Sequence, residues 1–327
     1  MKLDHRVYGE IQISEPVIIE LINCPALQRL KEIDQAGYFE PHYQGSSQTR
    51  FEHSIGDYYL LTKYGALLEE CIAGLIHDVS HAAFSHCIDY VLDEGSEKEQ
   101  TYQDNVFVEF VKNTEIPSIL KKYDLDPDFV SNEENFSLQE RNLPDLCADR
   151  IDYTFLTAIA HKAFDRSGVN YFLDNLIIQE KCWVFRNFES AKKFADLYLK
   201  FNNAIWSGMP SAIMFRTVGD YLKYSIQKGY ISKDDLYTTN KKVLSKINTY
   251  LEEDEKLRSL FDRMNLKIGV RNDPQDYDAH IFCKSRVVDP LCMHEGAAVR
   301  ISDVDPSWRD VITQQSKPKE YFLKFER

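Results

Sequence analysis

The segment GLIHDVSHAAFSH, residues 74–86, restricts the possible folds of this chain more than any other stretch. The dense apolar run from Cys71 to Ile76 leads straight into His77 and Asp78, which predicts a buried helix that ends on polar side chains. On a helix, His77 and His81 lie one turn apart on a shared face, and Asp78 lies beside that face. Burying imidazole and carboxylate groups without partners costs roughly 2–7 kcal/mol for each group. A metal ion bonded to them removes that cost, so the pattern indicates a metal site.

The simplest alternative for a His-Asp pair is a surface pair, or a histidine at a helix end with a capping aspartate, because short motif matches are often accidental. The neighbourhood favours the metal site, since four of the nine histidines fall within residues 53–86. Imidazole and carboxylate ligands together suit Mn, Fe, Co, Ni or Zn better than Ca. We therefore expect one divalent transition metal as the cofactor, with room for water and substrate oxygens.

Apolar residues recur at helical spacing through most of the first 230 residues, which predicts a helical core. Two short hairpins are predicted within it, at 6–13 around Gly9 and at 170–188. After about residue 260 the chain changes to short β-type runs separated by Pro, Gly and Asp. We predict a mainly α fold, in which a helical core carries small β-hairpins and is followed by a smaller α+β C-terminal part.

The predicted division is a core at 1–205 and a C-terminal region at 206–327 that packs on it, with the boundary between 205 and 265. In the second region, the run KSRVVDP at 284–290 is basic and ends in Asp-Pro. A solvated β-edge strand followed by a turn is the favoured interpretation of this run, and an effector or phosphate site is the alternative.

The net charge of −13 argues against a protein that coats nucleic acid nonspecifically, because phosphate neutralisation needs clustered Lys and Arg. It does not exclude an anionic substrate, since a metal and a few cations can make a site locally positive. The seven cysteines are scattered and never spaced as CxxC, which suits reduced thiols. No stretch resembles a signal peptide or a membrane span, so we expect a cytoplasmic protein without membrane contact.

Four segments, in this order and with suitable gaps, resemble the motifs of the HD-superfamily phosphohydrolases. Within that superfamily the chain is most similar to the branch of dNTP triphosphohydrolases, of the sterile-alpha-motif/HD-domain type, from about residue 4 to 230. The resemblance implies a helical fold around a single or double metal site, with His53, His77, Asp78 and Asp149 as ligands. A second divalent ion such as Mg would then bind with the substrate phosphates. The four segments are VYGEIQISEPVIIELINCPALQRLKEIDQAG (7–37), TRFEHSIG (49–56), GLIHDVSHAAFSH (74–86) and ADRIDY (148–153).

The resemblance also implies roles for residues around the ligands. The substrate-binding residues are Gln35 and Tyr153 toward the sugar, and Arg50, Lys98, Arg150 and Arg216 toward the phosphates. The catalytic residues, which assist proton transfer and position water, are His81, His86, Asp89 and Glu99.

One departure from the family pattern affects the expected reaction. Lys98-Glu99 stands where the triphosphohydrolases carry a catalytic His-Glu pair, and no histidine lies between His86 and His161. Lysine is a poor proton shuttle near neutral pH unless its pKa is strongly lowered. The bond that is cleaved therefore stays open at this point.

Structural roles are the alternatives for several of these residues. Arg50 and Arg150 could form ion pairs with neighbouring carboxylates. His86 could be a core histidine bonded to backbone, and Tyr153 could pack in the core. Asp152, three residues after the last ligand, is expected to orient a neighbour rather than bind the metal.

Three functions follow from these patterns. The first is hydrolysis of a dNTP to deoxynucleoside and triphosphate. The second is a phosphomonoesterase or phosphodiesterase reaction on another small phosphorylated molecule, and the third is nucleotide sensing with weak catalysis. The expected partner is thus a small phosphorylated substrate, and assembly into a homo-oligomer is compatible with the family.

Overall fold

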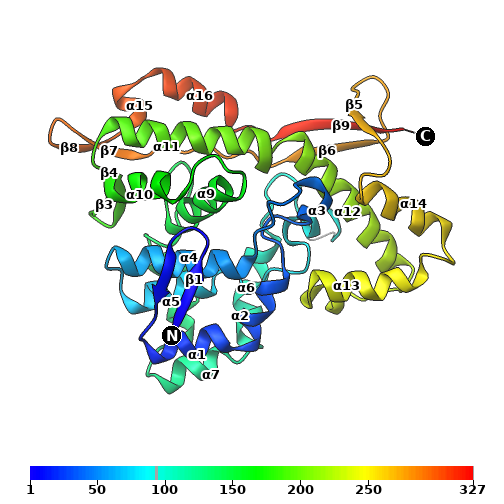
Figure 1. Ribbon diagram of the computed structural model, residues 1–327, viewed down its shortest axis with the longest axis horizontal. Helices are drawn as coiled ribbons and strands as arrows, with labels where there is room; N and C mark the ends of the chain where they lie inside the picture. The colour runs from blue at the N-terminus through cyan, green and yellow to red at the C-terminus, as the bar shows by residue number, and fades with distance from the viewer. Residues whose placement is uncertain (93–94, 327) are drawn as a thin grey trace.

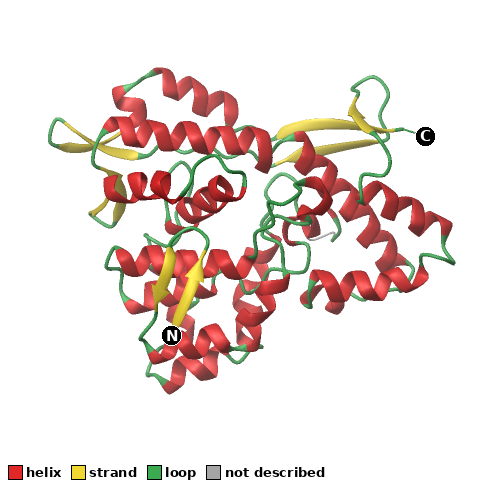
Figure 2. Cartoon of the chain, viewed as in Figure 1, coloured by secondary structure: helices red, strands yellow, loops and turns green. Residues whose placement is uncertain are grey.

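Helix α4 (Arg50–Lys63) packs against α5 (Leu68–Ile76) and α9 (Ala148–Ala160), and these three helices carry the motif residues (Figure 1). The computed structural model describes residues 1–92 and 95–326, and it is mainly helical with small sheets, as predicted (Figure 2). The side chain of Thr49 accepts a hydrogen bond from the backbone N–H of Glu52, and the Glu52 carboxylate accepts from the backbone N–H of Thr49. This capping box sets the start of α4.

The N-terminal hairpin lies against α4, with strands β1 (Lys2–His5) and β2 (Gly9–Gln12) paired antiparallel. The predicted placement over 6–13 was wrong, because residues 6–8 form the turn. Gly9 begins the second strand at φ +76°, a backbone conformation that only glycine adopts without strain.

Short helices complete the N-terminal part, and prolines mark several of their starts. Pro16, Pro25 and Pro127 each occupy the first position of a helix, where the missing N–H has no helical partner to lose. The elements are α1 (Pro16–Asn23), α2 (Pro25–Arg29), η1 (Leu30–Glu32), α3 (Phe39–His42), η2 (Ser85–Tyr90), α6 (Tyr102–Lys112), α7 (Ile116–Lys122), α8 (Pro127–Val130) and η3 (Glu133–Asn135).

A second layer covers α9 and contains the hairpin predicted at 170–188, except that residues 170–175 end a helix and the strands lie within 176–185. Its strands pair antiparallel across a two-residue turn, Glu180-Lys181, in which both residues have positive φ. The second of these strands also pairs in parallel with a strand from the C-terminal part. The elements are α10 (Arg166–Asn175), β3 (Leu176–Gln179), β4 (Cys182–Phe185), α11 (Phe188–Phe201), the π-helical turn η4 (Asn202–Trp206), β7 (Leu291–His294), β8 (Ala297–Arg300), α15 (Ile301–Val304) and α16 (Ser307–Gln315).

The remaining elements form the side of the molecule on the right of Figure 1. A long helix leads there, two shorter helices follow, and a sheet of three antiparallel strands in the order β5-β9-β6 lies beside them. The α+β character predicted for the C-terminal part is confirmed. The elements are α12 (Met209–Gln227), η5 (Asp234–Tyr237), α13 (Asn240–Ile247), η6 (Asn248–Tyr250), α14 (Glu255–Met264), β5 (Val270–Asn272), β6 (Ala279–Cys283) and β9 (Lys319–Phe325).

Residues 284–290 are not the solvated edge strand that the sequence favoured. They pair with no strand, and Val287 and Val288 are buried. The segment joins β6 to β7, which lie on opposite sides of the molecule (Figure 1), so it crosses the fold instead of following its edge. The prediction failed because local composition cannot tell a basic edge from a basic segment whose apolar residues reach a distant core.

Two large hydrophobic clusters hold the fold together. The first joins the N-terminal helices to α9 and α11 and includes Val287, Val288 and Trp308 from the C-terminal part. The second surrounds α12 and includes η2, which follows the HD motif. The motif residues therefore lie between two packed clusters that fix them from both sides.

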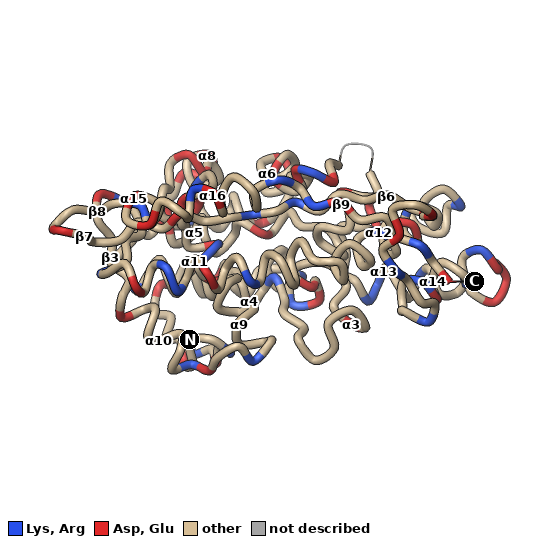
Figure 3. The backbone as a smooth tube through the Cα atoms, turned by 90° about the horizontal axis from the view of Figure 1, so that it is seen from above, with Lys and Arg blue, Asp and Glu red and all other residues tan. Residues whose placement is uncertain are grey.

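Lys and Arg are mixed with Asp and Glu along the backbone (Figure 3). Within residues 1–92 and 95–326, no helix combines the length and the apolar character that a bilayer crossing requires.

We predict that Thr49→Ala lowers the free energy of unfolding by about 1 kcal/mol, because α4 loses its side-chain cap. Chemical denaturation monitored by circular dichroism measures this loss. Thr49→Ser keeps the hydroxyl and should unfold like the wild type. Equal destabilisation by both substitutions would show that the cap hydrogen bond is not the cause.

Candidate metal centre

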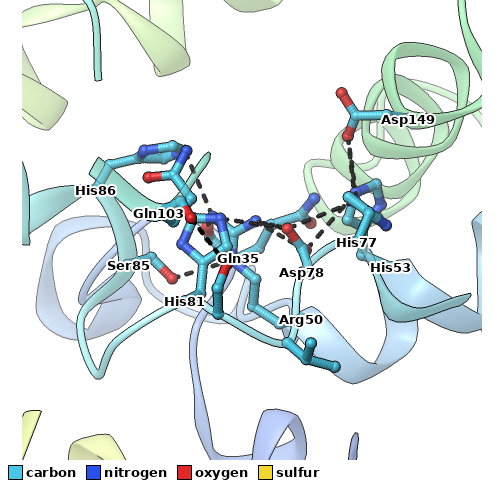
Figure 4. A network of polar contacts seen from close by, with 12 residues as sticks. Gln35, Arg50, His53, His77, Asp78, His81, Ser85, His86, Gln103 and Asp149 are labelled. Atoms are coloured by element: carbon cyan, nitrogen blue, oxygen red, sulfur yellow. Dashed lines mark hydrogen bonds and ion pairs between the residues drawn. The ribbon is translucent and has the colours of Figure 1, made fainter. Parts of the chain in front are cut away.

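Four side chains from α4, from the turn after α5 and from α9 bring nitrogen and oxygen atoms toward one point (Figure 4). His53 lies in the first turns of α4, His77 and Asp78 directly follow α5, and Asp149 lies in the first turn of α9. His53 Nε2 is 2.9 Å from Asp149 Oδ1 and 3.3 Å from His77 Nε2. Asp78 Oδ1 is 3.5 Å from His77 Nε2, and Asp78 Oδ2 is 3.9 Å from His53 Nε2. The structure thus brings the four predicted ligands together.

Hydrogen bonds behind the two rings determine which nitrogen keeps its lone pair. His77 Nδ1 lies 2.7 Å from the carbonyl oxygen of Gly74, and because a carbonyl only accepts, Nδ1 is the donor. His53 Nδ1 likewise donates to Asp152 Oδ2 at 2.7 Å. Both rings therefore turn Nε2 toward the shared point. Metal-binding histidines are held in this way by a carbonyl or carboxylate on the other nitrogen.

Asp152 is fixed from two further sides. Tyr8, in the turn of the N-terminal hairpin, donates its hydroxyl to Asp152 Oδ1 at 2.7 Å. Gly56 on α4 leaves room for the carboxylate, since a Cβ there would lie 1.9 Å from Asp152 Oδ1. The contact with His53 agrees with the expectation that Asp152 orients a neighbour.

Asp57 is a second carboxylate behind the rings. Asp57, His53, His77 and Asp149 offer ligand atoms within 4.8 Å of one another. Asp57 is closest, however, to the Nδ1 atoms, at 3.8 Å from His53 and 3.6 Å from His77. Both of its oxygens are buried without a hydrogen-bond partner in the part of the chain that the structure describes. On the Nε2 side of the rings, Asp78 is therefore the better placed carboxylate.

The carboxylates favour a positive charge at this point. Burial alone would lower the pKa of His53, but the charge of Asp57 and the hydrogen bonds to Asp149 and Asp152 raise it well above its usual value. Burial opposes ionisation of Asp149, yet its contacts with His53 lower its pKa to about 2. Either a proton on His53 or a cation between the ligands can provide the positive charge that these carboxylates favour.

Arg50 is a buried cation on the other side of Asp78. Its Nη1 donates to both Asp78 oxygens at 2.7 and 2.8 Å. Burial by itself would raise the pKa of Asp78, but Arg50 holds it well below the usual range. Arg50 also donates from Nε to Ser85 Oγ at 3.1 Å and from Nη2 to the carbonyl of Gln35. Because a carboxylate has about four lone-pair sites, Asp78 can accept from Arg50 and still offer oxygen to a metal.

The donor set fits a divalent transition metal. The donor-atom separations given above run from 2.9 Å between His53 and Asp149 to 3.9 Å between His53 and Asp78. Metal–ligand bonds of about 2.1 Å place neighbouring octahedral ligands about 3.0 Å apart. Two imidazoles and two carboxylates are also the ligand types that such metals prefer.

Two of the predicted proton-transfer residues, His81 and His86, lie next to Arg50, and a third, Asp89, lies beside His86. His81 Nε2 is 3.2 Å from Asp78 Oδ1, and its ring meets that of His86 edge to face at 5.3 Å. His86 Nδ1 is 3.8 Å from Asp89 Oδ2. Burial lowers the pKa of His86 to about 4, so this ring is neutral near pH 7.

A strained turn directs His86 to this place. Phe84 and Ser85 have φ values of +64° and +43°, which cost of order 1–3 kcal/mol for residues with a side chain. The N–H of Phe84 donates to Asn240 Oδ1 at 2.8 Å, and Ser85 Oγ donates to the carbonyl of Asp34 at 2.6 Å. These contacts hold the turn in place, and the turn directs His86 back toward the four predicted ligands.

Two predicted sugar contacts border the cluster. Gln35 carries a buried side-chain oxygen with no hydrogen-bond partner among residues 1–92 and 95–326. The ring of Tyr153 lies 6.4 Å from the ring of His53, and its hydroxyl bonds to that of Tyr198. Tyr153 therefore combines a packing contact with a position beside the candidate metal site.

Arg150 is ion-paired next to the cluster. Glu140, Cys147 and Asp149 form a second group with metal-compatible spacing. Arg150 occupies it, since Nη2 lies 3.0 Å from Glu140 Oε1 and Nη1 donates to Cys147 Sγ at 2.7 Å. A guanidinium already balances this group, so we assign no ion to it.

Lys98, Glu99 and Arg216 are not joined to the cluster. Lys98 is exposed, with Nζ 4.1 Å from the centroid of the Phe282 ring, and Glu99 is exposed as well. Arg216 pairs at 2.9 Å with Asp220 on the same helix. No hydrogen bond or ion pair within the described ranges links any of these three to the four predicted ligands. Their functional roles stay predictions.

Sequence reasoning missed three residues that support the rings. Asp57 follows His53 by four positions, and this helical spacing was a usable signal. Gly56 and Tyr8 gave no signal, because their importance comes from Asp152. That residue is 144 positions from Tyr8, and such a contact has no local pattern.

No family model matches the chain. The Bacillus subtilis protein YdhJ is 32% identical to it over 327 residues, which cover 99% of both chains. The metal-dependent phosphohydrolase cns2 of Cordyceps militaris is 30% identical over 237 residues, or 71% of this chain and 68% of that protein. The deoxynucleoside triphosphate triphosphohydrolase SAMHD1 of Mus musculus is 32% identical over 142 residues, or 37% of this chain and 21% of that protein.

Solved structures share the fold at low sequence identity. A protein of Aquifex aeolicus superposes with a TM-score of 0.73 at 18% identity, over 99% of this chain and 96% of its own. A phosphohydrolase of Bacteroides thetaiotaomicron superposes with a TM-score of 0.70 at 16% identity, over 100% of both chains.

We predict that Asp152→Asn weakens divalent-metal binding about 10- to 100-fold, because His53 loses the carboxylate that orients it. Calorimetric titration of Mn²⁺ into chelator-treated protein measures the dissociation constant. Asp303→Asn is the matched control, since Asp303 is exposed and pairs only with Arg309 among the described residues. Unchanged affinity in Asp152→Asn would refute the orienting role.

Proposed function

The chain belongs to the HD superfamily of metal-dependent phosphohydrolases, and on that premise we propose that it hydrolyses a nucleotide. The proposed substrate is a dNTP, and the proposed products are the deoxynucleoside and inorganic triphosphate. The observation that carries the proposal is the convergence of two imidazole Nε2 atoms and two carboxylates beside the buried guanidinium of Arg50.

We propose that His53, His77, Asp78 and Asp149 hold one divalent transition metal, Mn²⁺, Fe²⁺, Co²⁺, Ni²⁺ or Zn²⁺. The chemistry that such an ion supplies is activation of water and neutralisation of phosphate charge. A second divalent ion such as Mg²⁺ would enter with the substrate phosphates. Asp152 and the Gly74 carbonyl keep the two rings turned toward the ligand position.

Arg50 is the proposed phosphate contact of the HD motif. Its planar fork can bind phosphate oxygens bidentately, whereas Nη1 alone now donates to both oxygens of Asp78. His86 Nε2 lies 3.4 Å from Arg50 Nη2, so a phosphate bound to Arg50 comes within reach of this ring. The charge of a bound phosphate would raise the low pKa of His86, and the proposed role of this ring is to accept a proton from the attacking water and pass it to the leaving group.

A nucleotide is proposed because groups suited to a sugar border the ligands. The free Gln35 side-chain oxygen can accept a hydrogen bond from a sugar hydroxyl. Tyr153 offers an aromatic face beside His53. The likeness to the dNTP triphosphohydrolase SAMHD1 supports the same substrate class over 37% of the chain.

A phosphomonoesterase reaction is the second candidate, and one observation favours it. Lys98 and Glu99, at the position of the family's catalytic His-Glu pair, are exposed and make no contact with the ligands among the residues described. A smaller set of proton-transfer groups suffices for a phosphomonoester with a good leaving group.

We predict that metal-loaded protein releases deoxynucleoside and inorganic triphosphate from dNTPs. The test is incubation with dNTPs, nucleoside monophosphates and simple phosphate esters, with products resolved by chromatography. Asp149→Ala should lower the rate by more than about 100-fold, because a ligand carboxylate is lost. Asp196→Asn is the control, since that residue is exposed and pairs with Lys192.

The product pattern separates the candidates. Inorganic phosphate from monoesters, with intact dNTPs, would replace the triphosphohydrolase proposal by the second candidate. Nucleotide binding without hydrolysis would point to sensing. Full activity in Asp149→Ala would contradict the ligand assignment.

A further inference from the structure

The C-terminal segment that crosses the fold turns two cations to one side. Burial alternates along residues 283–287, where Cys283, Ser285 and Val287 are buried and Lys284 and Arg286 are half-buried. Alternate residues of such a segment point in opposite directions. The two cationic side chains therefore share the side that the buried residues leave.

The side chain of a buried asparagine holds this segment in place through hydrogen bonds. Asn202, fully buried in the π-helical turn η4, donates from Nδ2 to Ser285 Oγ at 2.9 Å and accepts from the N–H of Arg286 at 2.9 Å. Ser285 Oγ in turn donates to the carbonyl of Gln315 at 2.5 Å. Single π-helical turns within helical regions occur frequently at functional sites. The backbone of Ser285 and Arg286 is thus held in one place.

Arg286 faces the residues around the candidate metal centre. Its Nη2 donates to Gln100 Oε1 at 3.3 Å. Burial is the main cause of the low pKa of His86, and the charges of Arg50 and Arg286 add to it. Burial raises the pKa of Tyr153, and Arg286 is among the cations that oppose the rise. Gln100 stands two residues before Tyr102, whose backbone N–H donates to Asp89 Oδ1 at 3.2 Å, and Asp89 Oδ2 lies 3.8 Å from His86 Nδ1. Arg286 therefore borders the side of the centre on which His86 lies.

Lys284 is the second cation on this side of the segment, and it lies toward Arg150. Burial first, and then the charge of Arg286, lower the pKa of Lys284 to about 8, with a smaller contribution from Arg150. Lys284 has no hydrogen bond or ion pair within residues 1–92 and 95–326. Two carboxylates, Asp104 and then Glu99, oppose this lowering. A half-buried ammonium beside two guanidinium groups is costly unless an anion joins them.

We propose that Lys284 and Arg286 bind phosphate groups of the substrate and complete the active site from the C-terminal segment. The proposal deepens the function proposed above, in that the anion is taken to be the substrate's phosphate chain. Arginine can contact phosphate bidentately and lysine adds a point charge. With Arg50 beside the metal ligands and these two cations on the His86 side of the centre, the arrangement suits a chain of phosphates better than a single phosphate.

Binding of inorganic tripolyphosphate tests this without relying on catalysis. Calorimetry on the full chain gives the dissociation constant for the wild type, Lys284→Gln and Arg286→Gln. We expect each substitution to weaken binding at least about tenfold, as expected for a lost charge-assisted contact, with Mn²⁺ affinity unchanged. Arg286→Lys, which keeps the charge, should recover part of the loss. Because the positions are changed separately, a variant that failed to fold would leave the other to decide.

Lys317→Gln is the matched control, because Lys317 is an exposed cation of the same C-terminal part. Equal tripolyphosphate affinity in the wild type and both Gln variants would overturn the proposal, as would absence of binding to the wild type or an equal loss in Lys317→Gln. Binding that depends on Lys284 and Arg286 in a protein that cleaves no nucleotide would uphold this inference and overturn only the proposed reaction.

Discussion

Two imidazole rings with their Nε2 atoms 3.3 Å apart form the constraint on which the centre of this fold depends. Each ring has its Nδ1 hydrogen committed, one to a backbone carbonyl and one to Asp152. Two nitrogen lone pairs that face each other repel unless a positive charge lies between or beside them. The surrounding carboxylates, above all Asp78 and Asp149, provide the opposite charge that makes a cation favourable there.

The layers around the rings serve this arrangement. The capping box at Thr49 sets the start of α4 and hence the position of His53 along that helix. The N-terminal hairpin brings Tyr8 to Asp152, and Gly56 leaves the space in which the carboxylate lies. Both hydrophobic clusters border the HD motif, so the packing of the helices determines the geometry of the site. A shift of one helix would move a ligand by more than a coordination bond tolerates.

The charge of the molecule is arranged on two scales. Over the whole chain the net charge is −13, and acidic and basic residues are mixed along the backbone (Figure 3). Around the ligands, the cations of the motif helices are paired with acids, Arg50 with Asp78 and Arg150 with Glu140. A bound metal and the proposed contacts Lys284 and Arg286 would make this place locally positive, which favours a small anion that fits the site over a long polyanion, which must lie along the surface.

The sequence alone determined those features of the protein that a local sequence pattern can encode. Helical spacing predicted the main helices, alternation around Glu180-Lys181 predicted that hairpin, and short β-type runs predicted the C-terminal α+β character. The motifs supplied the four side chains that the structure brings together. Only the tertiary structure decided that Asp57 also stands behind His77, that Tyr8 and Asn202 act as supports, and that residues 284–290 cross the fold. These features depend on contacts between residues tens to hundreds of positions apart. Burial, orientation and the sharing of a hydrogen-bond partner arise from packing, so no stretch of sequence carries them alone.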